Sequence, residues 1–219
     1  MIFGIIGAAI AGIASVASTI GSVLTATVKT IVALTPTIEK MITFVQLVTN
    51  VGQILGVVKP NENLEDLGAK VLQPETRPRM PTESAEEYLN YLRNDVKLDQ
   101  TRKEHMNESD KFLCNLVGAS IGLNASSEHL GIDMSPQFIN ATIKAGLKGQ
   151  EVVKIAQQLE RCGMECDKFN DYMKNSLSDN DIETVNAAIK GMVKEIYPDF
   201  TDKEIRAEIN QMFREFGSN

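Results

Sequence analysis

The first 28 residues of the chain carry no charged side chain, and Lys29 is the first charge that the sequence reaches. The whole chain holds 22 basic and 29 acidic residues, so nearly all of its charge lies after this segment. Small residues recur within it at every fourth position, which on an α-helix places them in rows along one face. Such rows allow another backbone to approach closely. We therefore expect a helix that meets lipid or copies of itself.

The small residues form three rows, Gly4-Ala8-Gly12, Gly7-Ala11-Ser15-Thr19 and Ala14-Ser18-Ser22. The residues predicted to mediate helix association are Gly4, Gly7, Ala8, Ala11, Gly12 and Ser15. The opposite face carries the bulky side chains Ile6, Ile10, Ile13, Ile20 and Leu24. A bulky ridge packs well into the small groove of a neighbouring helix, so the chain itself is the first expected partner.

The apolar region continues to residue 58 with a break at Thr35-Pro36, where Thr35 is expected to cap a second helix. The only charges of residues 1–58 are Lys29, Glu39 and Lys40, which gather around that break. Two uncharged arms joined by a charged tip indicate a helical hairpin over residues 1–58. At about 1.5 Å per residue the first arm reaches roughly 42 Å and the second about 27 Å, against a hydrocarbon core of about 30 Å.

The second arm carries a polar stripe at helical spacing. Its members are Thr43, Gln46, Asn50 and Gln53. Such uncharged polar side chains can face water, line a lumen, or form hydrogen bonds across a helix bundle. The sequence leaves these three interpretations open.

A change of composition over residues 59–82 predicts a linker. Pro74, Pro78 and Pro81 fall within eight residues and forbid a continuous helix there, which favours a semi-rigid extended strut. The strut is the expected boundary between the hairpin and an acidic helical domain of residues 83–219.

Residues 83–219 read as one helix after another. The residues expected to cap helix N-termini are Ser84, Ser135, Ser178 and Thr201, and two of them open capping boxes with Glu87 and Glu204. No stretch shows sustained period-2 alternation. The predicted fold is all-α: an N-terminal apolar hairpin rich in small residues, a Pro-rich linker and a C-terminal multi-helix bundle.

Charge and cysteine content exclude several classes. The net charge is −7, of which residues 1–58 carry +1 and residues 59–219 carry −8. The acidic body argues against nucleic-acid binding and against its attraction to anionic lipid. Three cysteines are too few, and odd in number, for a disulfide framework. We therefore expect synthesis in a reducing cytoplasm.

Little in the sequence points to catalysis. His105 lies in a polar run and His129 at an expected helix end, with no serine or cysteine at a recognisable spacing. Cys162 and Cys166 form the sharpest local pattern, but a metal site needs two more ligands, and Gly163 is expected to end a helix there. No catalytic, cofactor-binding or metal residue and no small-molecule substrate is predicted.

The sequence thus predicts a non-enzymatic membrane-inserting or pore-forming protein that self-associates through the hairpin, of the kind delivered by a phage or a secretion system. The alternative is a structural subunit of a phage tail, injection machine or toxin–chaperone complex, with the hairpin buried against partner helices. The expected location is accordingly a membrane, or a large secreted or virion assembly. A third interpretation makes the first two helices the core of a soluble domain, and the length of uncharged sequence disfavours it.

Overall fold

Every regular element in the described part of the chain is an α-helix, which confirms the predicted all-α class. The computed structural model describes residue 21 and residues 24–218. The chain divides into two compact units, Met1–His129 and Leu130–Asn219. This division differs from the boundary predicted over residues 59–82. That stretch belongs to the first unit, where Leu64, Leu67 and Val71 are buried.

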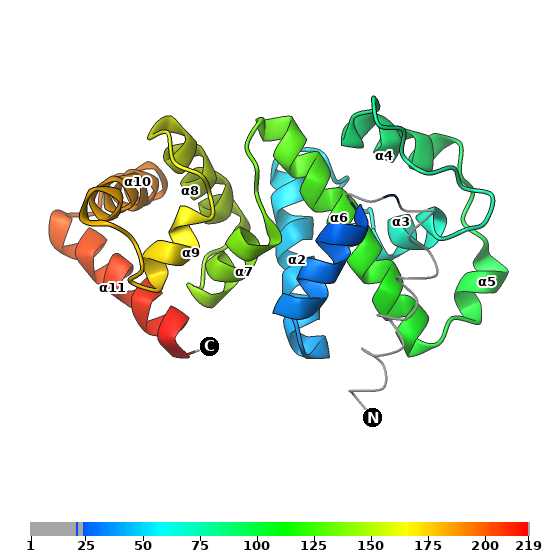
Figure 1. Cartoon of the computed structure of the whole chain (residues 1–219), viewed down its shortest axis with the longest axis horizontal. Coiled ribbons are helices and arrows are strands. Elements are labelled where there is room, and N and C mark those ends of the chain that lie inside the picture. Colours follow the sequence, from blue (N-terminus) through cyan, green and yellow to red (C-terminus); the bar gives the residue numbers. More distant parts are fainter. Residues whose placement is uncertain (1–20, 22–23, 219) are drawn as a thin grey trace. The chain divides into compact units, whose positions relative to one another are not determined.

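The helices of the first unit begin before the Thr35-Pro36 break. Residues 24–34 are helical, and α2 (Ile38–Ile54), α3 (Leu64–Val71), α4 (Ala85–Asn94), α5 (Gln100–Glu104) and α6 (Glu108–Leu130) follow (Figure 1). The stretch 24–34 buries Leu24, Val28, Ile31 and Val32, one face of a helix at spacings of three and four residues. The described part of the predicted first arm therefore supplies core side chains.

Helix α2 contributes its apolar face to the core of the first unit. Its buried side chains include Met41, Phe44, Leu47, Val48 and Val51. Complete burial of side chains of this size is worth about 1.5–3 kcal/mol each. The second arm of the predicted hairpin is thus an integral helix of a packed unit.

The cap of α2 is Thr37, so the prediction that Thr35 caps this helix is wrong. The Thr37 side chain accepts a hydrogen bond from the backbone N–H of Lys40. The Thr35 hydroxyl instead donates to the carbonyl of Ile31, 2.7 Å away, and so belongs to the end of the preceding helix. Pro36 separates the two threonines and does not lie in the first turn of α2.

The second unit consists of five described helices. They are α7 (Pro136–Lys144), α8 (Gly149–Arg161), α9 (Lys168–Met173), α10 (Asp179–Ile196) and α11 (Asp202–Ser218). α10 packs on α8, α9 and α11, and α7 packs on α9 and α11. Phe138 and Phe169 meet edge to face at its centre, with ring centroids 6.2 Å apart.

The predicted N-caps of the downstream helices are confirmed. Ser84 caps α4 in a complete capping box with Glu87, and the side chains of Ser135 and Ser178 accept hydrogen bonds from the first turns of α7 and α10. Thr201 and Glu204 exchange the same pair of bonds at the start of α11. Each such cap contributes about 1 kcal/mol to helix stability.

Candidate functional site

The residues predicted to mediate helix association lie outside the described residues. They are Gly4, Gly7, Ala8, Ala11, Gly12 and Ser15. The predicted first arm, residues 1–28, is therefore represented only by residue 21 and residues 24–28. Within residue 21 and residues 24–218, no helix has both the length and the apolarity required to cross a membrane.

The predicted polar stripe runs along the outer face of α2. Thr43, Gln46 and Asn50 are exposed, and Gln53 is half-buried. The Thr43 hydroxyl donates to the carbonyl of Glu39 in the same helix, and the Gln53 amide donates to the carbonyl of Pro60 at 3.3 Å. The structure thus brings all four side chains to one face, directly opposite the core side of α2.

A hollow of about 310 Å³ lies beside the N-terminal turns of α2. Ile38, Met41, Ile42 and Phe112 give it an apolar floor. Its remaining lining residues are Glu65, Glu108, Lys111 and Asn115. It adjoins Ile42, which is the first exposed apolar side chain of the outer face of α2.

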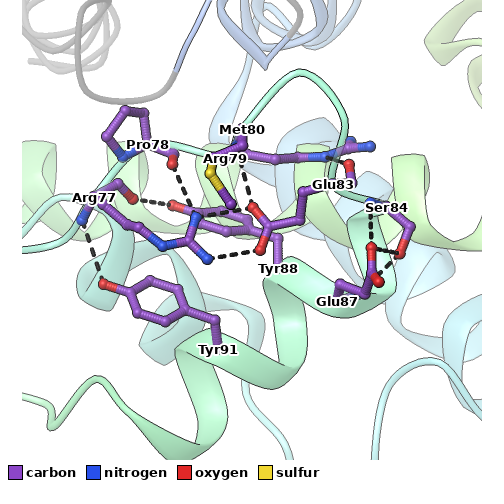
Figure 2. A network of polar contacts seen from close by, with 9 residues as sticks. All are labelled: Arg77, Pro78, Arg79, Met80, Glu83, Ser84, Glu87, Tyr88 and Tyr91. Atoms are coloured by element: carbon purple, nitrogen blue, oxygen red, sulfur yellow. Dashed lines mark hydrogen bonds and ion pairs between the residues drawn. The ribbon is translucent and has the colours of Figure 1, made fainter.

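A network of polar contacts in the first unit centres on Arg77 (Figure 2). Its guanidinium donates two hydrogen bonds to the Glu83 carboxylate, at 2.9 and 2.7 Å, and lies 4.1 Å from the centroid of the Tyr91 ring. The Tyr88 hydroxyl donates to the Arg77 carbonyl, and the Arg77 N–H donates to the Tyr91 hydroxyl. Side chain and backbone of Arg77 are therefore both held against α4.

Arg79 anchors the same segment a second time. Its Nε donates to the Glu83 carbonyl, and its Nη2 pairs with Glu128 of α6 at 2.7 Å. The other carboxylate oxygen of Glu128 accepts the backbone N–H of Ala85 in the first turn of α4. One carboxylate thus links the Pro-rich segment, α4 and α6.

Hydrogen bonds from the Arg77 guanidinium hold the pKa of the Glu83 carboxyl below its ordinary value of 4.5, against the opposing effect of burial. Burial raises the pKa of the Tyr88 phenol to about 12. At neutral pH the Glu83 carboxylate is therefore ionised and the Tyr88 phenol is neutral. In these states the network holds the Pro-rich segment against α4. Sequence reasoning missed this anchoring. The signal was available in two arginines among the prolines, followed by an acid and by tyrosines three apart on one helix.

The cysteine pattern resolves into one exposed and one buried thiol. Cys162 is exposed at the C-cap of α8, and Gly163 follows with a φ of +68°. The predicted helix end at Gly163 is confirmed. Burial raises the pKa of the Cys114 and Cys166 thiols to about 12. Neither buried thiol forms the thiolate that nucleophilic or metal chemistry needs at neutral pH.

The two histidines lie at helix ends, which confirms the prediction for His129. His105 caps the C-terminus of α5 and its Nδ1 lies 2.7 Å from the carbonyl of Thr101. His129 is exposed in the last turn of α6, 3.9 Å from the Glu86 carboxylate. In the described part of the chain, no group of three or more histidine, cysteine, aspartate or glutamate side chains is placed to hold a metal ion.

The second unit has an acidic hollow of about 200 Å³ at the C-terminal end of α8. Its lining residues are Ile132, Asp133, Ser135, Glu160, Glu165, Cys166 and Asp167. The Ser135 hydroxyl donates to Asp167 and its oxygen caps α7. The serine of this hollow therefore serves the fold.

Comparisons of the chain with known protein families, with curated proteins and with solved structures gave no match.

Proposed function

We propose that this chain is a non-enzymatic helical protein that associates with membranes, and with copies of itself, through the uncharged segment of residues 1–20. The observation that carries the proposal is the placement of α2. Its apolar face fills the core of the first unit and its polar stripe faces outward. Transfer of α2 into lipid would require the core of that unit to open. The segment left for lipid therefore precedes residue 24.

The composition of residues 1–20 supports a modest affinity for lipid. Eight residues of Ile2–Ile20 are isoleucine, valine or phenylalanine, each worth about −0.3 to −0.6 kcal/mol at the membrane centre. Their sum, about −2 to −5 kcal/mol before the small polar residues are counted, makes insertion of one copy marginal. The rows of small residues allow copies to pack closely, which adds stability to the inserted state.

The acidic body supports insertion by apolar contact alone. Residues 59–219 carry a net charge of −8, so attraction to anionic headgroups is not available to this acidic body. Membrane association should therefore depend little on the anionic lipid content or on salt. This behaviour separates the proposal from binding through a basic surface.

A second candidate function is a subunit of a helical assembly, such as a phage tail, an injection machine or a toxin–chaperone complex. The observation that favours it is the outer face of α2, where Thr43, Gln46 and Asn50 are exposed and uncharged. In this case residues 1–20 would pack against partner helices and would have no affinity for lipid.

Flotation with vesicles of neutral phosphatidylcholine tests the proposal. The intact chain should float with the vesicles, and Ile10→Asp should prevent flotation, because an aspartate at the centre of an inserted helix costs about 2.5–3.5 kcal/mol. The matched control is Ile54→Asp on the exposed side of α2, which should leave flotation unchanged.

Three other results would redirect the proposal. Loss of flotation in Ile54→Asp as well would mean that α2 enters the bilayer, as the original hairpin hypothesis requires. An intact chain that remains with the solution but forms oligomers would favour the assembly subunit. An intact chain that neither floats nor oligomerises would exclude both candidate functions.

A further inference from the structure

The second unit, Leu130–Asn219, draws its hydrophobic core from all five of its described helices. Each helix contributes at least one buried apolar side chain, and examples in chain order are Phe138, Leu159, Phe169, Ile189 and Ile209. α10 packs on α8, α9 and α11, and α7 packs on α9 and α11, so packing within the unit connects all five helices. The burial of this apolar surface is the main favourable contribution to folding.

The buried polar side chains of the second unit find their hydrogen-bond partners inside it. Among its described residues these side chains are Thr142 and Glu151. The Thr142 hydroxyl donates to the carbonyl of Ile139, and the Glu151 carboxylate accepts from the Lys148 N–H at 2.7 Å and from the Tyr197 hydroxyl at 3.0 Å. Burial of these groups therefore does not leave them without partners, which would cost stability.

The first unit, Met1–His129, likewise has an apolar core of its own. Residues 24–34 and the helices α2, α3, α4 and α6 each contribute to it, with Ile31, Phe44, Leu64, Leu89 and Ile121 as examples. Polar contacts join the same elements. The Lys70 ammonium of α3 donates to the carbonyl of Leu92 in α4 at 2.7 Å. Arg93 pairs with Glu62 and donates to the carbonyl of Val57, which ties α4 to the segment after α2.

Each unit is one continuous stretch of the chain, and the boundary between them falls at a helix end. α6 ends at Leu130, and the exposed Gly131 follows with a φ of +67°. Glycine at positive φ is a common way for a helix to end, because the residue has no Cβ atom to clash. The second unit, with about 90 residues, lies within the size range of domains that fold alone.

We propose that the two units unfold independently, so that the first unit can open while the second remains folded. A continuous segment that buries its own core and pairs its own polar groups keeps these contacts when the rest of the chain unfolds. Release of α2 from its core then costs only the stability of the first unit, and α7–α11 stay packed. The inference concerns the body of the chain and is independent of whether residues 1–20 bind lipid.

Urea unfolding of the intact chain, followed by the fluorescence of one tryptophan at a time, tests the proposal. The chain contains no tryptophan, so a single introduced indole reports on one unit. Phe112→Trp places the reporter in α6, where Phe112 lines the hollow of about 310 Å³ beside α2 and a larger ring has room. Phe213→Trp places it in α11, where Phe213 is half-buried with its ring centroid 5.2 Å from that of Tyr172.

Two matched substitutions then weaken one unit at a time. Ile121 in α6 and Ile189 in α10 are both at most 1% exposed, and Ile→Val removes one buried methylene group from either core. We expect Ile121→Val to lower the urea midpoint reported by Phe112→Trp by about 0.5 M and to leave the midpoint reported by Phe213→Trp unchanged. Ile189→Val should do the reverse.

A shift of both midpoints by either substitution would overturn the proposal, because it would show that the chain unfolds in one cooperative transition. If Ile121→Val prevented the first unit from folding, the proposal still requires a complete transition at Phe213→Trp with an unchanged midpoint. Loss of that transition would contradict independent unfolding as clearly as a shared shift.

Discussion

Gly118 of α6 faces the carbonyl oxygen of Leu64 in α3 so closely that a Cβ atom there would lie 1.8 Å from that oxygen. The contact is reciprocal one helical turn away: a Cβ atom on Gly68 of α3 would lie 1.9 Å from the carbonyl oxygen of Cys114 in α6. Each helix thus supplies a glycine against the backbone of the other. The close approach of α3 and α6 requires both.

Gly118→Ala should therefore destabilise the first unit by about 1–3 kcal/mol, the usual cost of forcing extra atoms into a packed contact. Backbone atoms cannot rotate away as a side chain can, so α3 must shift. Urea unfolding followed by circular dichroism measures the loss. Gly217→Ala is the control, because a Cβ atom at Gly217 meets nothing within 4 Å. A stability equal to that of the control would show that the helices separate without cost.

This contact illustrates what the sequence alone could predict. The all-α class and the caps at Ser84, Ser135, Ser178 and Thr201 follow from local rules, because a cap depends on three or four neighbouring residues. Gly68 and Gly118 are fifty residues apart, and no local pattern pairs them. The prolines near Arg77 predicted an extended strut for the same reason. Local sequence does not show that Arg77 pairs with Glu83, or that Arg79 pairs with Glu128 of α6.

The role of α2 was also beyond local reasoning. Spacing correctly placed Gln46 and Asn50 on one face, since helical periodicity is a property of the sequence. Uncharged runs on both sides of Pro36 predicted a hairpin separate from the body. That expectation could not show that Val48 of α2 meets Leu64 of α3 beside Gly122 of α6. An apolar pattern predicts that a side chain is buried, but it does not identify the element against which the side chain packs.

Glu83→Gln should lower the stability of the first unit by about 1 kcal/mol at neutral pH, because the ion pair with Arg77 is partly open to water. The pKa of Glu83 is depressed in the folded chain, so its stabilisation is complete above the ordinary value of 4.5. It is lost as the pH falls through the lower folded value. The variant should show a shallower loss of stability over that acid range in urea unfolding.

The exposed Glu104 provides the comparison for this experiment. Glu104→Gln removes the same charge without touching the Arg77 network, so its stability should follow that of the unchanged chain at every pH. If Glu83→Gln and Glu104→Gln gave the same pH profile, the network around Arg77 would contribute no pH-dependent stability.

Glu195→Gln should loosen the contact between α8 and α10. Its carboxylate accepts from Gln158 at 2.5 Å and from Arg161 at 2.6 Å, and pairs with Lys154 at 3.0 Å. The side chain is 30% exposed, so we expect a loss of at most about 1 kcal/mol, smaller in high salt because these charges are screened. Thermal unfolding at low and high salt measures it. Glu108→Gln, at a far more exposed pair, should have no effect, and a salt-independent loss would contradict the ionic origin.

The three thiols should react in two classes with a disulfide reagent such as dithionitrobenzoate at neutral pH. Cys162 is exposed and should react at once, whereas Cys114 and Cys166 are buried with pKa values of about 12 and should react only after unfolding. Cys162→Ser should therefore abolish the fast phase in the folded chain and leave two thiols that titrate in denaturant. A fast phase that persisted in this variant would mean that the buried thiols become accessible without global unfolding.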